Sequence, residues 1–321
     1  MNELVSILIP VYNREAIIGE TIHSALSQTY SNFEIIIFDN KSTDKTWDII
    51  QKYSKKNNCI RAFQNEENVG PVRNWKKCID EAKGVYGKIL FSDDLISTDF
   101  IEKTVPFLKN NEIGFVFTST TIFNDKIDIN TLNYSIGNTG IYGSEKYING
   151  ALFEGGYPVS PGCAIFRTND LKENLLLNIQ NYSIKDFCSH GIGSDLLIYL
   201  LIANKYKYFA FVNKPLSFFR HHEGSISIKS ADGKLPLFYM LAKSYFVENH
   251  RMDLIRRINT HIFFMLKLYN NNEYGLKYIR DFYSANNNYN LSFLELYKKA
   301  INIRIIKKIL TIFFKRVFGE I

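Results

Sequence analysis

Between residues 5 and 118, short apolar runs alternate with longer segments in which apolar residues recur at helical spacing. The short runs predict β-strands at 5–10, 33–38, 60–63, 88–91 and 114–118. The segments between them predict helices at 14–27, 42–53, 69–82 and 98–108. Strands that are separated by helices pair in parallel, because the helical crossover returns the chain to the same edge of the sheet. We therefore expect an α/β fold in which helices flank a mostly parallel sheet.

The pattern loosens after residue 118, where glycines mark turns between short strands. Such loop-rich stretches commonly form the wall of a parallel sheet that faces a substrate. Helical spacing returns at 194–204, and two further strands are predicted at 208–212 and 216–220. Beyond Leu235 the chain is mostly helical, with an asparagine-rich loop near 286–290. We expect these helices to form a C-terminal extension of the α/β fold.

The composition excludes several classes of protein. The four cysteines are scattered and form no Cys-x-x-Cys pair, so we expect neither disulfides nor a structural zinc site. Glu3 stands where a signal peptide would carry positive charge, and Pro10 interrupts the first apolar run. No later run reaches the length of about 18 uncharged apolar residues that a spanning helix needs. These features favour a cytoplasmic protein.

The net charge of +7 is concentrated near the C-terminal end of the sequence. Residues 298–319 contain seven basic residues and no acid, so the rest of the chain is neutral overall. A neutral body disfavours nucleic acid as a partner, whereas one basic tail favours an anionic surface. In this tail, Arg304 and Lys308 share one helical stripe, while Leu310 and Phe313 share another, as in helices that lie on the anionic inner face of a membrane. A terminal helix packed on the core, with its basic face in solvent, would show the same pattern.

Carboxylates follow the predicted strands at the positions where parallel sheets bind ligands. Asp39 comes after the second strand, and Asp93 and Asp94 end the apolar run that forms the fourth. Because the carboxyl ends of parallel strands meet in one crevice, these side chains can share a ligand, and paired carboxylates suit a divalent cation that holds phosphates. A strand followed by a capped turn would explain Ser92-Asp93-Asp94 as well.

Two common nucleotide-binding motifs are absent from the sequence. No Gly-x-Gly-x-x-Gly follows the first strand, and no Gly-Lys-Ser/Thr loop is present. This argues against a nicotinamide-dinucleotide site and a P-loop, and it disfavours a nucleotidyltransferase. A nucleotide held without a glycine-rich cradle needs another way to neutralise its phosphates, and a carboxylate-bound Mg²⁺ or Mn²⁺ provides one.

Several segments follow one another as they do in family 2 glycosyltransferases of the GT-A fold. They are Ile7-Leu8-Ile9-Pro10-Val11-Tyr12-Asn13, Asp39-Asn40-Lys41-Ser42-Thr43-Asp44, Asn68-Val69-Gly70 with Arg73-Asn74, and Ser92-Asp93-Asp94. The ordered set is far more specific than any one motif, and the resemblance covers residues 4–228. It implies a Rossmann-like GT-A domain at 1–228, followed by a helical region at 229–321 that ends in the basic tail.

The resemblance assigns one group of residues to the nucleotide. Pro10, Tyr12 and Asp39 match positions around the base, and Asp39 would accept a hydrogen bond from a uracil imide. Asp44 and Arg73 match positions near the base and the diphosphate. Both acids also have structural explanations, because Asp39 could cap a turn and Asp44 could favour the first turn of a helix.

The resemblance assigns a second group to the diphosphate and its metal. Ser92-Asp93-Asp94 corresponds to the Asp-x-Asp motif of the family, so Asp94 would ligate Mn²⁺ or Mg²⁺ and Asp93 would contact the ribose or support the metal ligands. Ser92 replaces the first Asp of that motif. The segment from Phe219 to Ser227 resembles an aromatic-Arg-x-His-x-x-Ser-x-Ser motif, in which His222 would reach the metal or the diphosphate and Arg220 would counter phosphate charge. Without the family, a His-His pair in a loop would be read as a solvated turn.

The resemblance also assigns the catalytic base. Gly193-Ser194-Asp195 matches the site of a Glu-Asp pair whose Asp deprotonates the acceptor hydroxyl, although Ser194 replaces the Glu. Asp195 could instead be a helix N-cap. A position at a helix N-terminus lowers the pKa of a carboxylate and weakens it as a base, so burial would have to offset that effect.

These assignments together predict an inverting, metal-dependent glycosyltransferase. It would move a sugar from a nucleoside diphosphate, expected to be a UDP-sugar, to a saccharide or lipid-linked acceptor in bacterial surface glycan assembly. Because Ser92 and Ser194 depart from the family pattern, a protein that binds nucleotide-sugars or a membrane surface without turnover is the alternative. The two are separated by testing for release of UDP.

Overall fold

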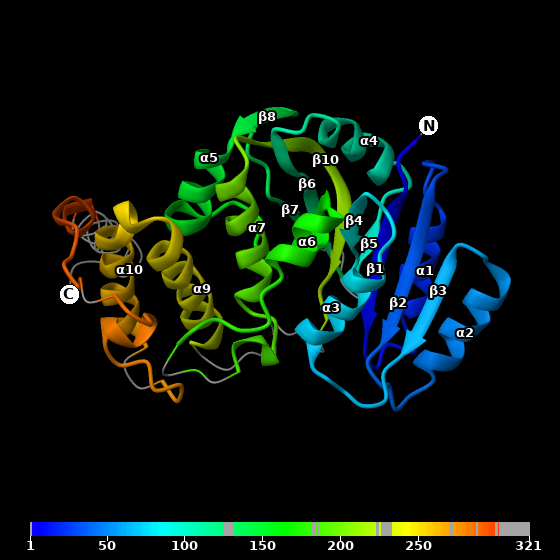
Figure 1. Ribbon diagram of the computed structural model, residues 1–321, viewed down its shortest axis with the longest axis horizontal. Helices are drawn as coiled ribbons and strands as arrows, with labels where there is room; N and C mark the ends of the chain where they lie inside the picture. Colours follow the sequence, from blue (N-terminus) through cyan, green and yellow to red (C-terminus); the bar gives the residue numbers. More distant parts are fainter. Residues whose placement is uncertain are drawn as a thin grey trace, which may run out of the picture.

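A mixed β-sheet organises the N-terminal two-thirds of the protein (Figure 1). The computed structural model describes residues 2–124, 131–181, 184, 186–222, 225, 233–269, 272–286, 288–298 and 301. In this part of the chain the sheet has 10 strands, in the order β3-β2-β1-β4-β9-β6-β10-β5, with β7 paired to β6 and β8 paired to β10.

The first half of the sheet is parallel. Its strands are β1 (Val5–Val11), β2 (Phe33–Asp39), β3 (Ile60–Gln64) and β4 (Tyr86–Ile89). The helices that alternate with them are α1 (Ile18–Leu26), α2 (Thr46–Lys56) and α3 (Pro71–Glu81). Every residue of β1 is buried, as expected for a strand covered on both faces. Successive side chains point to opposite faces, so Ile7 and Ile9 pack in the core under α1, whereas Leu8 packs in the core under α3.

The second half of the sheet contains both strand directions. Its strands are β5 (Leu95–Ile96), β6 (Ile113–Phe123), β7 (Thr131–Asn133), β8 (Gly140–Gly143), β9 (Ala164–Arg167) and β10 (Tyr208–Arg220). β9 runs antiparallel to both of its neighbours, β4 and β6, whereas β10 runs parallel to β6. The strands β1 to β4, β6 and β10 therefore share one direction, and the predicted α/β fold class is confirmed.

Some predicted boundaries were wrong. β10 is one strand where the sequence predicted two, and its register against β6 shifts on either side of Pro215, which has no N–H to donate. The helix predicted from Ser42 begins at Thr46, because the Ser42 hydroxyl bonds Asp39 instead of capping a helix. The helix predicted from Arg14 begins at Ile18.

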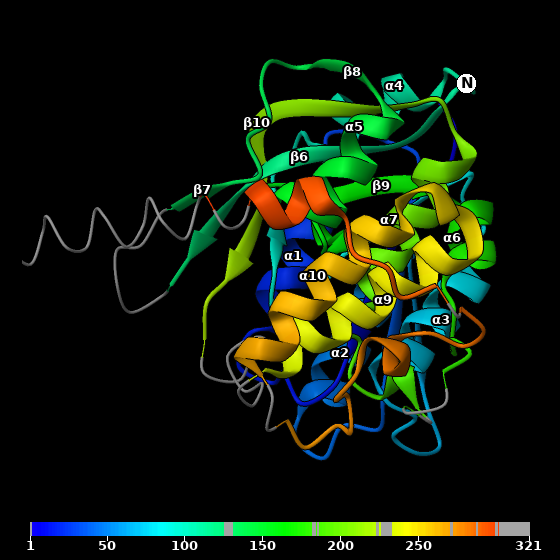
Figure 2. The same ribbon diagram turned by 90° about the vertical axis from the view of Figure 1, so that its left-hand side faces the viewer.

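The remaining helices are α4 (Phe100–Leu108), α5 (Ser144–Asn149), α6 (Thr168–Asn174), α7 (Ser194–Lys205), α9 (Lys234–His250) and α10 (Ile255–Leu268). Of these, α4 packs on the face of the sheet that α1 covers, whereas α5, α6 and α7 pack on the face that α3 covers. Short helices lie at Gly150–Glu154, Pro161–Cys163, Phe187–Ser189, Met252–Leu254 and Ile279–Phe282. α9 packs on α7 and α10 packs on α9, so α10 lies outermost (Figure 1 and Figure 2).

The C-terminal helices share a hydrophobic core with the α/β part. Phe117 of β6, Tyr199 of α7, Phe246 of α9 and Ile262 of α10 belong to one buried cluster. The division into 1–228 and 229–321 stays a prediction. Within the described ranges no helix is long and apolar enough to cross a membrane. The basic tail at 298–319 lies almost wholly outside the described residues, and with it the predicted membrane contact.

Candidate active site

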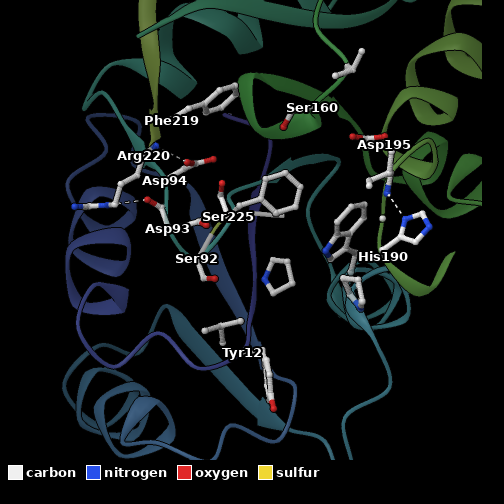
Figure 3. A pocket seen from close by; sticks show the side chains of 18 of the residues that line it. Tyr12, Ser92, Asp93, Asp94, Ser160, His190, Asp195, Phe219, Arg220 and Ser225 are labelled. Carbon is white, nitrogen blue, oxygen red and sulfur yellow. Dashed lines mark hydrogen bonds between the residues drawn. The ribbon is translucent and has the colours of Figure 1, made fainter. Parts of the chain in front are cut away.

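A cavity of about 450 Å³ opens where β1 and β4 end. Figure 3 shows the acid pair and Arg220 on one side of it, and Asp195 and His190 on the other. The predicted site residues in its wall are Pro10, Tyr12, Asp93, Asp94, Asp195 and Arg220. They come from segments far apart in the sequence, so the fold brings together most of the residues that the resemblance selected.

The acid pair lies in a tight turn after β4. The Asp94 N–H donates to the Phe91 carbonyl at 3.0 Å, and this bond turns both carboxylates toward the end of the sheet. Asp94 Oδ1 accepts from the Arg220 N–H at 3.1 Å, and only 8% of Asp94 is exposed. Burial and, after it, the neighbouring Asp93 charge raise the pKa of Asp94 well above its usual value. Added positive charge would therefore stabilise the ionised form of this carboxylate.

Basic side chains surround the acid pair. Arg220 Nε donates to the Asp93 carbonyl at 3.1 Å, and its Nη2 donates to Glu20 at 2.6 Å. Asp93 Oδ2 lies 3.0 Å from His222 Nε2 and 3.5 Å from Arg14 Nη2. The two predicted residues of β10 and its extension, Arg220 and His222, thus both contact the turn that carries the acids.

A buried lysine also lies near this turn. Lys88 of β4 is fully buried, donates to the Gly162 carbonyl, and has its Nζ 4.4 Å from the centre of the Phe100 ring. Burial lowers the pKa of Lys88 to about 7. The sequence pattern gave no reason to select this residue, because a lysine in an apolar strand normally points to solvent.

The donor set at the acid pair fits a divalent cation that takes part of its coordination from a substrate. Within the described residues no group of three or more His, Cys, Asp or Glu side chains is gathered to hold a metal ion. Mg²⁺ sites that bind nucleotides usually use one or two carboxylates, with phosphate oxygens and water completing the shell. Asp93 and Asp94 supply two adjacent carboxylates, and His222 contacts Asp93. These residues therefore fit a metal held jointly with a diphosphate.

Asp195 lies in the first turn of α7, on the far side of the cavity. Its Oδ1 accepts from the N–H groups of Gly193 at 2.9 Å and Leu196 at 2.8 Å, and its Oδ2 accepts from the Tyr239 hydroxyl at 2.9 Å. Burial raises the pKa of Asp195 to about 7, although these hydrogen bonds act in the opposite direction. The carboxylate can therefore accept a proton near neutral pH, as a general base must.

Two glycines let the loop before Asp195 pack closely. Gly191 has a φ of +81°, and a Cβ there would lie 2.9 Å from the Trp75 indole of α3. Gly193 has a φ of +92°, and a Cβ there would lie 2.6 Å from the Phe187 ring and 2.9 Å from the Phe238 carbonyl of α9. The loop is thus wedged between α3 and α9, which fixes where α7 begins.

Three predicted nucleotide residues have other contacts. Asp39 is fully buried and accepts from the Ser42 N–H at 3.0 Å and from the Gln64 amide at 2.8 Å. Asp44 accepts from the N–H groups of Thr46 and Glu15; burial would raise its pKa, but these bonds outweigh burial and lower it.

The third of these residues is Arg73. It pairs with Asp186 at 3.1 Å on the surface. Asp39, Asp44 and Arg73 are not among the described residues of the cavity wall, so their nucleotide roles stay predictions.

Other residues of the cavity wall were not predicted. Asn40, Trp75, His190 and Tyr239 line it. Tyr239 lies 44 residues beyond Asp195, in helix α9 of the predicted extension. No spacing rule connects such a residue to the site, since only the tertiary packing of α9 on α7 brings it there.

The comparison of sequences places the chain in a family. The sequence profile described as "Glycosyl transferase family 2" matches residues 6–175, which is more than half of the 321 residues. The chain therefore belongs to glycosyltransferase family 2, and the predicted family is confirmed.

Two curated relatives show how far the similarity extends. The putative teichuronic acid biosynthesis glycosyltransferase TuaG of Bacillus subtilis is 38% identical over 119 residues, which cover 37% of this chain and 47% of TuaG. The UDP-Glc:alpha-D-GlcNAc-diphosphoundecaprenol beta-1,3-glucosyltransferase WfaP of Escherichia coli is 37% identical over 153 residues, which cover 47% of this chain and 56% of WfaP. The chain spans about half the length of the curated relatives it matches.

A solved structure has the same fold. Residues 1–349 of TarS from S. aureus, in complex with UDP-GlcNAc, superimpose with a TM-score of 0.63 at 18% identity, over 84% of this chain and 73% of the TarS chain. At that identity the match establishes the fold, which is the GT-A fold expected from the sequence.

Proposed function

We propose that the protein is an inverting glycosyltransferase that moves a sugar from a UDP-sugar to a hydroxyl of a saccharide or lipid-linked acceptor. One observation carries the proposal: a buried carboxylate with a pKa of about 7, Asp195, shares a cavity with the acid pair Asp93 and Asp94. A base on one side and a phosphate site on the other suit attack on the anomeric carbon from the face opposite the leaving diphosphate.

Residues on the two sides of the cavity have different roles in the reaction. Asp195 takes the proton of the acceptor hydroxyl as its oxygen bonds to the anomeric carbon. The bond from that carbon to the diphosphate breaks, and UDP leaves with the electron pair, so the configuration inverts. Asp94 and His222, supported by Asp93, would hold Mn²⁺ or Mg²⁺; when bound, the cation neutralises diphosphate charge. Pro10 and Tyr12, which the family resemblance assigns to the base of the nucleotide, line the same cavity.

The named relatives support the substrate class. WfaP is named for a UDP-glucose donor and a lipid-diphosphate acceptor, TuaG for teichuronic acid biosynthesis, and the TarS complex holds UDP-GlcNAc. We therefore place the reaction in bacterial surface glycan assembly, at the cytoplasmic side of the membrane where a lipid-linked acceptor would be reached.

The test is a screen of UDP-sugars with a generic saccharide acceptor and Mn²⁺ or Mg²⁺, read as UDP release. We expect release with one donor, loss of release with EDTA, and recovery when the cation is restored. Asp94→Ala should abolish release, because the diphosphate would then face Asp93 alone. Asp80→Ala is the control, since this exposed acid of α3 pairs with Lys76 outside the cavity.

Two results would contradict the proposal. A saturable thermal shift with UDP but no release with any donor would indicate a nucleotide-sugar-binding protein without turnover. Full activity in EDTA would show that the metal role of Asp94 and His222 is wrong.

A further inference from the structure

We propose that Tyr239 of α9 is a positioning residue for the catalytic base, so that the C-terminal helices complete the active site. The proposal rests on the proposed function, because it assumes that Asp195 is the base. It follows from one hydrogen bond, 2.9 Å from the Tyr239 hydroxyl to Asp195 Oδ2, and from the packing that holds Tyr239 in place.

The hydrogen bonds to Asp195 leave one lone pair of its carboxylate free to accept a proton. Oδ1 already accepts from two backbone N–H groups, at Gly193 and Leu196, which uses both of its lone pairs. Oδ2 accepts from Tyr239 and keeps one lone pair. The hydroxyl thereby fixes the rotation of the carboxylate and the direction in which Oδ2 can take a proton.

The placement of Tyr239 is itself well defined. Leu235 and Tyr239, one helical turn apart on α9, both line the cavity. Between them, Phe238 packs edge-on against His190, with ring centres 4.2 Å apart, and against Tyr274 at 5.3 Å. The Phe238 carbonyl also faces Gly193 in the loop before the base. α9 is therefore held against the base loop, and not only against the outer surface of α7.

The neighbouring ionisable groups keep the pH dependence simple. Burial raises the pKa values of Tyr134, Tyr147 and Tyr239, so these phenols stay neutral where Asp195 titrates. Burial lowers the pKa of His190, which also lines the cavity, to about 4. On the far side of the cavity, burial also raises the pKa of Asp94 and lowers that of Lys88 to about 7, so the acid limb is assigned to Asp195 by its shift in Tyr239→Phe, whose hydroxyl bonds Asp195.

The experiment compares Tyr239→Phe with Tyr245→Phe. The first removes one hydroxyl and keeps the ring; the second makes the same change on the same helix at a residue outside the cavity wall. We expect Tyr239→Phe to lower kcat about tenfold, equivalent to about 1.4 kcal/mol, with the KM for the donor unchanged. The acid limb of kcat/KM should move to higher pH, because a hydrogen bond to a carboxylate stabilises its charged form. Tyr245→Phe should change neither quantity.

The outcomes separate this proposal from the proposed function. If Tyr239→Phe keeps the wild-type kcat and pH profile while Asp195→Asn is inactive, the role of Tyr239 is wrong and the base assignment stands. If Tyr239→Phe melts at a lower temperature and raises the donor KM with an unmoved acid limb, Tyr239 is only structural. If Asp195→Asn retains turnover, the base assignment itself fails.

Discussion

At Asp195, two physical effects act on one carboxylate in opposite directions. Its position in the first turn of α7 and its hydrogen bonds favour the charged form, whereas burial disfavours it. Burial has the larger effect, and the pKa rises to about 7. The sequence shows the position of Asp195 at the start of a helix, because neighbouring residues reveal it. The sequence does not show the burial of its carboxylate, because that burial depends on the packing of α9.

The first prediction follows from the sign of this shift. A base must be deprotonated to act, so kcat/KM should fall about tenfold for each pH unit below about 7. Asp195→Asn should abolish turnover and leave UDP affinity nearly unchanged, because the base acts on the acceptor proton. Calorimetric titration with UDP and a pH profile of UDP release measure both effects.

A control for folding comes from the same pKa. A carboxyl group whose pKa is raised by folding contributes stability that is fully present below its ordinary pKa of 3.8 and is lost as the pH rises to about 7. Above pH 7, therefore, Asp195→Asn removes a buried charge and should melt no lower than the wild type. Loss of UDP binding together with a lower melting temperature would instead show that Asp195 is a structural cap.

Residues that follow a strand were predictable, and residues that depend on packing were not. Asp93 and Asp94 end an apolar run, and open parallel sheets bind ligands in the crevice at the carboxyl ends of their strands. Both acids could therefore be predicted to line the site, and they do. The same rule also selected Asp39, which closes its own turn with Ser42 and bonds Gln64, and whose nucleotide role stays a prediction. Local sequence does not distinguish the two, because Asp suits both a ligand site and a turn.

At the scale of elements, the alternation of strands and helices was enough to predict the parallel half of the sheet. It was not enough to predict the other half. The burial of β1 on both faces and the start of α3 at Gly70-Pro71 follow from local rules. β9 could not be placed from sequence, since it inserts antiparallel between β4 and β6 from a loop-rich stretch. Two strands were predicted at 208–212 and 216–220, but β10 is continuous, with a register shift on either side of Pro215.

The second prediction concerns the loop that begins α7. Gly193→Ala adds a Cβ 2.6 Å from the Phe187 ring at a φ of +92°, so both strain and a clash arise. We expect the free energy of unfolding to fall by about 3 kcal/mol. Turnover should fall as well, since the clash displaces the backbone N–H that Asp195 accepts from. Urea denaturation and UDP release measure the two effects.

Gly155→Ala is the matched control for this change. Gly155 has a similar φ of +79°, but a Cβ there meets nothing within 4 Å. Its substitution should reduce stability by about 2 kcal/mol through backbone strain alone, with turnover unchanged. Equal losses in the two variants would show that packing of the base loop does not matter.

At the scale of the whole molecule, α9 contributes to the wall of the cavity, and α9 and α10 share a core with the sheet. Leu235 and Tyr239 line the cavity, and Phe246 and Ile262 join the buried cluster that contains Phe117. The sequence predicted these helices as an extension, because a helical pattern does not say which element a helix covers. The basic tail that follows them carries the net charge of the protein.

The third prediction tests that tail. Deleting the residues after 298 should detach the protein from vesicles of anionic lipid and leave transfer to a soluble acceptor analogue largely intact, because every assigned site residue lies before residue 240. Each basic residue near an anionic surface contributes about 1 kcal/mol, so binding of the intact chain should weaken steeply with salt. Vesicle co-sedimentation at two salt concentrations measures this.

A second variant separates charge from packing. Replacing Lys307, Lys308, Lys315 and Arg316 by Gln keeps the apolar stripe while removing most of the positive charge of the tail. If the tail lies on the membrane, this variant should lose vesicle binding and keep the wild-type melting temperature. If the tail packs on the core, the deletion should lower the melting temperature sharply, and the intact protein should ignore anionic vesicles even at low salt. Since the two arrangements differ in what the apolar stripe covers, each changes only one of the two quantities: vesicle binding if the tail lies on the membrane, and melting temperature if it packs on the core.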